Sequence, residues 1–170
     1  LEEAFPETVE TQPELLAHHY TQAGLTGQAI DYWQRAGERA LERSANLEAY
    51  RHFGQGIELI KLLSPSPAHT RREFRLYLGL GPATRAIKGY AAPETQDAFT
   101  RARELIDADT SLPEQMLVLY GLWGVHMVGV EHDSGRKTAE QALLLVARNA
   151  DTGAEPQALA NRLMGESLFV

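Results

Sequence analysis

Apolar residues recur along the chain at intervals of three and four positions, a spacing that places side chains on one face of an α-helix. The stretch from about Gly27 to Arg43 illustrates this pattern. Its apolar and small positions are Ala29, Ile30, Trp33, Ala36, Gly37, Ala40 and Leu41. No stretch alternates apolar and polar residues over the length of a strand with hairpin dipeptides at its ends. The pattern therefore predicts an all-α protein.

Helix-breaking residues divide this pattern into about eight segments. They predict helices over about 12–23, 27–43, 45–63, 68–88, 93–108, 113–130 and 135–149, with a last helix starting near 155. Ser44 is expected to cap the third helix, and Pro82 to kink or split the fourth. Because the connections are short, successive helices are expected to pack as antiparallel neighbours.

Two parts of the chain share a spacing of a bulky residue and a small one. Trp33 precedes Ala49 by sixteen positions, Trp123 precedes Ala139 by the same number, and the two pairs are offset by 90 residues. The accompanying positions are Ala36, Gly37, Ala40, Phe53 and Gly56 in the first stretch and His126, Met127, Val130, Leu143 and Val146 in the second. This spacing is typical of the tetratricopeptide helical hairpin, in which small residues lie where two helices touch.

The register of these hairpins stays open. A weaker middle hairpin would end with Ala98, Ala102 and Leu105. A second register starts from Leu16, Ala17, Tyr20 and Gly24 and continues with Ala29, Trp33 and Ala36. Both registers predict a tetratricopeptide-like right-handed superhelix of about eight antiparallel helices, whose units stabilise their neighbours. A generic helical bundle with small residues at its crossings is the alternative.

Length and charge narrow the class of protein. The 170 residues amount to one ordinary domain, and we expect 1–170 to be a single helical-repeat domain excised from a larger protein and truncated at both ends. The net charge of −7 argues against a nucleic-acid module and an anionic membrane partner. The chain has no cysteine, no apolar run long enough to span a membrane and no signal-peptide pattern, so we expect a cytoplasmic protein.

Few residues suggest chemistry. No phosphate-binding P-loop motif occurs, and Glu14 and His18 with the adjacent His19 form at most half of a metal site. We therefore expect no catalytic residue, no cofactor and no metal. Arg71, Arg72 and Arg75 form one basic helical turn, which is the candidate partner surface for an acidic protein or a neighbouring domain.

Several stretches resemble a known family. They are 12–20, 23–37, the positions Tyr50, Gly56 and Leu59, and 88–94, which reads Lys-Gly-Tyr-Ala-Ala-Pro-Glu. They resemble the tetratricopeptide-repeat region of bacterial multidomain adenylate/guanylate cyclase proteins that contain an AAA-like (STAND-type) ATPase module. The resemblance covers most of 12–150. It implies that the chain is the repeat region after the ATPase module and does not include the catalytic domains.

Three function classes remain. The first is a non-enzymatic module for protein–protein or interdomain interaction in a bacterial signalling protein, whose partner is another protein or the neighbouring ATPase and cyclase domains. The second is the helical inducer-sensing arm of a STAND-type transcription regulator. The third is a small helical hydrolase or metalloprotein that uses His18, His126 or His132.

Overall fold

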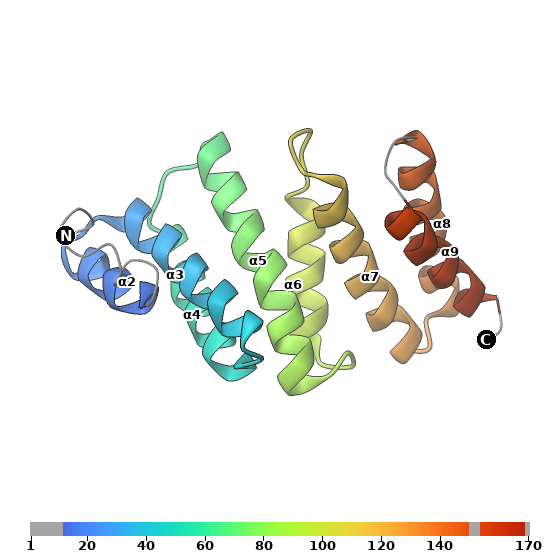
Figure 1. Ribbon diagram of the computed structural model, residues 1–170, viewed down its shortest axis with the longest axis horizontal. Coiled ribbons are helices and arrows are strands. Elements are labelled where there is room, and N and C mark those ends of the chain that lie inside the picture. The colour runs from blue at the N-terminus through green and yellow to red at the C-terminus, as the bar shows by residue number, and fades with distance from the viewer. Residues whose placement is uncertain (1–11, 150–153, 169–170) are drawn as a thin grey trace. The chain divides into compact units, whose positions relative to one another are not determined.

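The computed structural model describes residues 12–149 and 154–168, and these residues form eight α-helices and no strand (Figure 1). The helices are α2 (Pro13–Gln22), α3 (Thr26–Glu42), α4 (Asn46–Ile60), α5 (Pro67–Lys88), α6 (Pro93–Glu104), α7 (Leu112–Val128), α8 (His132–Arg148) and α9 (Ala154–Ser167). The all-α prediction is confirmed. Within the described ranges, no helix combines the length and the apolar character that a membrane crossing requires.

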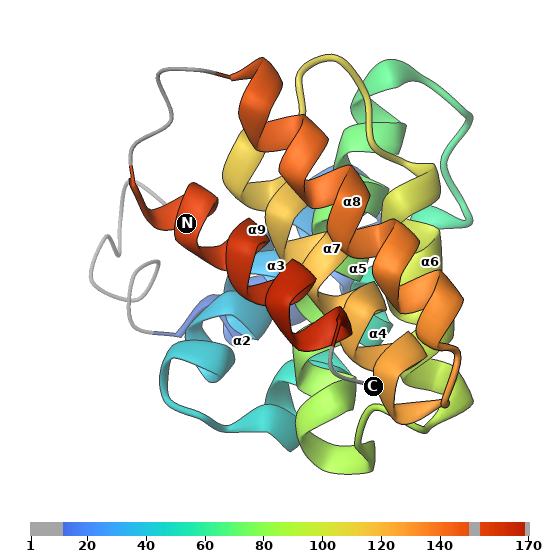
Figure 2. The same ribbon diagram turned by 90° about the vertical axis from the view of Figure 1, so that its right-hand side faces the viewer.

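The chain divides into two compact units, 1–87 and 88–170. In the first unit α3 packs against both α2 and α4, and in the second α7 contacts α6, α8 and α9 (Figures 1 and 2). Helix α3 therefore packs against two neighbours in the first unit and α7 against three in the second. Each unit has its own apolar core.

The core of the first unit is built around the ring of Phe53, which is fully buried. A methyl group on Gly37 of α3 would come within 2.6 Å of this ring, and one on Gly79 of α5 would overlap it from the other helix. The ring therefore lies directly against the backbones of α3 and α5. Gly56 on α4 gives Leu76 of α5 a similar close approach, because a Cβ atom at Gly56 would lie only 2.5 Å from the leucine Cδ2.

The second unit uses the same device with different residues. The fully buried Phe99 of α6 lies against Gly121 of α7, and Tyr90 lies against Gly124 about one turn further along α7. A Cβ atom at either glycine would overlap the facing ring. These contacts explain why α7, although apolar on most sides, has glycines at the two positions where the rings lie, despite their cost in a helix.

Both tryptophans of the shared spacing are held by the same kind of hydrogen bond. The Nε1–H of the buried Trp33 donates to Thr21 Oγ1 at 3.2 Å, and that hydroxyl donates to the carbonyl of Ala17 at 2.7 Å. Trp123 Nε1–H donates to Ser167 Oγ at 2.8 Å, and that hydroxyl donates to Leu163 O at 2.7 Å. A hydroxyl on an adjacent helix thus satisfies each indole donor, which burial would otherwise penalise.

One local prediction, that of Ser44 as a helix cap, is wrong. Ser44 does not cap α4. It has φ of 58°, and its amide donates to Leu41 O at 2.8 Å, so it terminates α3 in the left-handed conformation that usually favours glycine. Of the two outcomes predicted at Pro82, a kink or a split, the split does not occur, because α5 is continuous from Pro67 to Lys88. The flanking Gly81 and Ala83 are both buried, so packing holds the helix in place on either side of the proline.

The contact at Gly37 gives a test of this core. Gly37→Ala is expected to lower the free energy of unfolding by about 1–3 kcal/mol, because the ring of Phe53 has the backbone of Gly79 behind it and cannot retreat. Gly54→Ala is the matched control in α4, since nothing lies within 4 Å of its Cβ position. That change is expected to leave stability unchanged or raise it by up to about 1 kcal/mol. Urea unfolding followed by circular dichroism measures both, and equal stability of the two variants would contradict the close packing.

Candidate functional site

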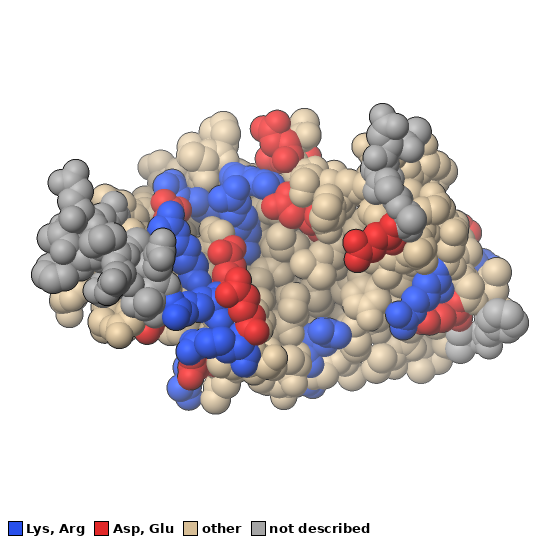
Figure 3. All heavy atoms as spheres, in the orientation of Figure 1, with Lys and Arg blue, Asp and Glu red and all other residues tan. Residues whose placement is uncertain are grey.

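The candidate site of the first unit is a cleft of about 430 Å³ between α3 and α5. Both helices contribute side chains at positions i, i+3, i+4 and i+7, which lie on one helical face. The lining residues are Asp31, Gln34, Arg35 and Glu38 from α3 and Ala68, Arg71, Arg72 and Arg75 from α5. We call this the arginine cleft. Figure 3 shows basic side chains gathered over α3 and α5, with acidic side chains between them.

A bidentate ion pair joins the two walls of the arginine cleft. Arg72 donates from Nε to Asp31 Oδ1 at 2.7 Å and from Nη2 to Asp31 Oδ2 at 3.0 Å. The hydrogen bonds to Asp31 raise the pKa of Arg72 above its ordinary value. The pair is partly exposed, so its main effect is to orient the guanidinium and to tie α5 to α3 rather than to contribute much stability.

Two other arginines of the cleft lie against aromatic rings. The guanidinium of Arg35 is 5.0 Å from the ring centroid of Tyr32, and that of Arg71 is 5.2 Å from the ring of Phe74. Cation–π contacts of this kind hold a guanidinium in place. The cleft is thus lined by four guanidiniums and two carboxylates, and one carboxylate is already engaged by Arg72. Its chemistry suits the binding of carboxylate or phosphate groups.

The sequence-predicted residues Arg71, Arg72 and Arg75 do line one cleft. The opposite wall of the cleft, which includes Asp31 and Arg35 of α3, was not predicted from the sequence. The two residues are four positions apart and so lie on one polar face of the helix, but the sequence did not indicate that this face lies opposite Arg72.

The histidines that suggested metal chemistry make other contacts. His18 touches Trp33 edge-on with ring centroids 4.7 Å apart, and His52 stacks on the same indole at 5.4 Å. His126 Nδ1 is 2.9 Å from Glu131 Oε2 near the α7–α8 turn. Within 12–149 and 154–168, no three His, Asp or Glu side chains are grouped so that they could hold a metal ion.

His52, which was not among the candidate metal ligands, has a perturbed pKa. Burial lowers the pKa of His52 below its ordinary value, and the nearby carboxylates of Glu14 and Glu48 offset part of this effect. The neutral imidazole is therefore the form that suits the stacked position on Trp33.

The fold and the cleft together define an all-helical protein built of packed helices, with a basic cleft on one of its two units. Comparison of the chain with protein-family models, with curated proteins and with solved structures gave no match.

The environment of His52 predicts a pH dependence of stability. Because its pKa is lower in the folded than in the unfolded chain, the unfolded chain binds more protons once the pH falls below about 6.5, and the folded state loses stability there. The free energy of unfolding is expected to decrease as the pH is lowered in the wild type, and to decrease less steeply in His52→Gln. Urea unfolding at a series of pH values measures the slope.

His19→Gln is the matched control for this measurement, because the His19 side chain is exposed on α2. The control is expected to follow the wild-type slope. An identical slope for the wild type and His52→Gln would refute the assignment to His52.

Proposed function

We propose that this chain is a tetratricopeptide-like helical-repeat module that binds another protein or a neighbouring domain of its own polypeptide and has no catalytic activity of its own. The observation that carries the proposal is the matched construction of two hairpins. In α3–α4 and in α7–α8, a tryptophan lies sixteen positions before an alanine, Ala49 or Ala139, that is fully buried. In both hairpins the indole N–H donates to a hydroxyl of a third helix.

The packing of Phe53 supports the same proposal. A tetratricopeptide hairpin needs small residues at its helix crossings and a large ring to fill the gap to the next helix. Phe53 fills such a gap between Gly37 on α3 and Gly79 on α5. We propose that hairpins of this kind stack as a right-handed array, in the register that pairs α3 with α4 and α7 with α8.

The arginine cleft is the proposed binding surface, and an acidic segment of the partner is the proposed occupant. Arginine recognises carboxylates through paired hydrogen bonds, and the guanidinium of Arg35 is already oriented by Tyr32. The net charge of the whole chain is −7, so a local excess of guanidiniums would steer an acidic segment to this face.

The resemblance of 12–150 to bacterial cyclase proteins suggests the partner. In such a protein the module would contact the STAND-type ATPase domain that precedes it. A contact that differs between the ATP-bound and ATP-free states would shift the balance between active and inactive forms by its difference in binding free energy.

The test uses the ATPase module encoded in the same reading frame, titrated calorimetrically with the chain in the presence and absence of ATP. Arg75→Glu is expected to weaken binding about tenfold, which is ~1.4 kcal/mol. Arg51→Glu is the matched control, because Arg51 is exposed on α4 and lies outside the cleft. Asp31→Asn is expected to act in the opposite direction and tighten binding, because it releases the guanidinium of Arg72.

Absence of binding in both nucleotide states would contradict the interdomain proposal, and equal effects of Arg75→Glu and Arg51→Glu would contradict the assignment to the cleft. The full reading frame tests the family. A class III cyclase domain and a P-loop are expected upstream, and a DNA-binding helix-turn-helix in their place would instead favour an inducer-sensing arm.

A further inference from the structure

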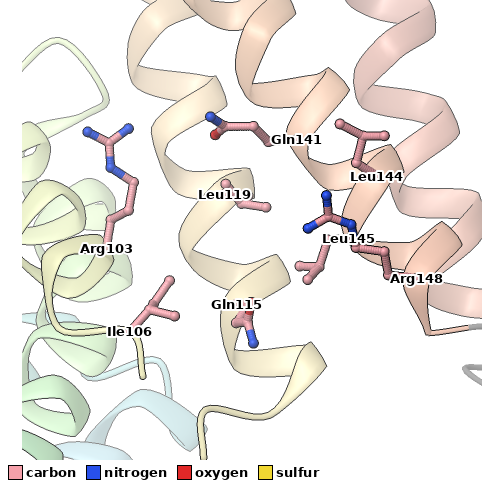
Figure 4. A pocket seen from close by; sticks show the side chains of 8 residues that line it. All are labelled: Arg103, Ile106, Gln115, Leu119, Gln141, Leu144, Leu145 and Arg148. Atoms are coloured by element: carbon pink, nitrogen blue, oxygen red, sulfur yellow. The ribbon is translucent and has the colours of Figure 1, made fainter. Parts of the chain in front are cut away.

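The second unit has an apolar surface groove of about 530 Å³ that is separate from the arginine cleft. Its floor is formed by Leu119 of α7 and by Leu144 and Leu145 of α8 (Figure 4). Leu119 is almost fully buried, but the side chain of Leu144 is 59% exposed. A leucine left this open to water beside two others marks a surface that gains free energy when it is covered.

Helix α8 presents one continuous face to this groove. Gln141, Leu144, Leu145 and Arg148 follow one another at i, i+3, i+4 and i+7, and Gln115 and Leu119 of α7 are four positions apart. The groove thus lies along two packed helices rather than at a single point. Grooves of this shape receive an amphipathic helix, whose own apolar residues repeat with the same spacing.

The charges at the edges specify the partner further. Arg103, from α6, and Arg148, from the last turn of α8, lie on opposite sides of Leu119 and Leu145 (Figure 4). No carboxylate lines the groove, and neither guanidinium makes an ion pair with any other residue that the structure describes. Two arginines on either side of an apolar floor complement an occupant that is apolar in its middle and acidic at its margins.

The exposure of Leu144 favours a polypeptide over a small molecule. Because one wall of the groove remains open to water, the occupant must keep a polar side in solvent while it covers the leucines, as an amphipathic helix does. The side-chain amide of Gln141, exposed on α8 and without a hydrogen bond to other described residues, offers a further donor and acceptor at the margin.

We propose that the groove lined by Leu119, Leu144 and Leu145 binds an amphipathic helix of a partner protein, with leucine-type residues on the floor and carboxylates paired to Arg103 and Arg148. This inference adds a second surface to the proposed interaction function and uses none of the residues of the arginine cleft. The two proposals can therefore fail separately.

The experiment measures fluorescence anisotropy of a labelled synthetic helix binding to the whole chain. The probe has leucines at i, i+3, i+4 and i+7 and glutamates at both margins of that face. Binding is expected to weaken about tenfold in Leu144→Ala and in the double variant Arg103→Glu/Arg148→Glu, and to become weaker as salt is added. A second peptide, in which lysines replace the glutamates, is expected to bind at least about tenfold more weakly than the first.

Matched controls lie on the same two helices. Leu117→Ala removes another exposed leucine, from α7 outside the groove, and Lys137→Glu reverses an exposed charge on α8 outside it. Both are expected to bind the glutamate peptide as the wild type does. The comparison is repeated in an Arg75→Glu background, so that binding of the acidic peptide to the arginine cleft does not contribute, and the same effects of the groove variants are expected there. Circular dichroism confirms that each variant is folded.

Three results would overturn the inference. The first is equal binding of the peptide by the wild type and Leu144→Ala. The second is equal binding of the glutamate and lysine peptides, which would remove the role of the two arginines. The third is binding of dodecanoate, but not of the peptide, at Leu144, which would replace the helix with an amphiphilic carboxylate. If the groove variants have no effect while Arg75→Glu still weakens binding of the ATPase module, only the groove proposal fails.

Discussion

The first unit depends on one contact, in which the ring of Phe53 lies between the backbones of two helices. Gly37 and Gly79 have no side chain at the positions that the ring occupies, so α3 and α5 approach α4 more closely than any larger residue would allow. Dispersion contacts and burial of a full aromatic side chain stabilise this arrangement, and the two glycines within helices destabilise it to a smaller extent. In the second unit, the ring of Phe99 packs against Gly121 in the same way.

This close approach also brings the polar faces of the helices together. Helix α3 turns Trp33 and Ala36 into the core, and the neighbouring Asp31 and Arg35 emerge toward α5. The distance between the two helices is set by Phe53, and at that distance Asp31 reaches Arg72 with both oxygens. The arginine cleft is therefore a consequence of core packing, because its two walls, α3 and α5, are separated along the chain by the whole of α4.

The sequence by itself determined the helices and their faces, because a period of three to four residues and well-placed proline and glycine residues depend only on local geometry. The sequence placed Arg71, Arg72 and Arg75 on one face of one helix. It also showed that Trp33 precedes Ala49 by sixteen positions. It failed at Ser44, where the preference of serine for a helix start was overridden by the left-handed turn that ends α3.

Only the tertiary structure decided which faces meet. That Gly37 and Gly79, 42 positions apart, flank the same ring is not visible in any local pattern. The partner of Arg72 is Asp31, 41 positions earlier. The exposure of Leu144 likewise depends on how the helices around it are packed. Helix periodicity is encoded within a few residues, whereas the meeting of two faces is a property of the whole core. For that reason the elements were predictable and the cleft and the groove were not.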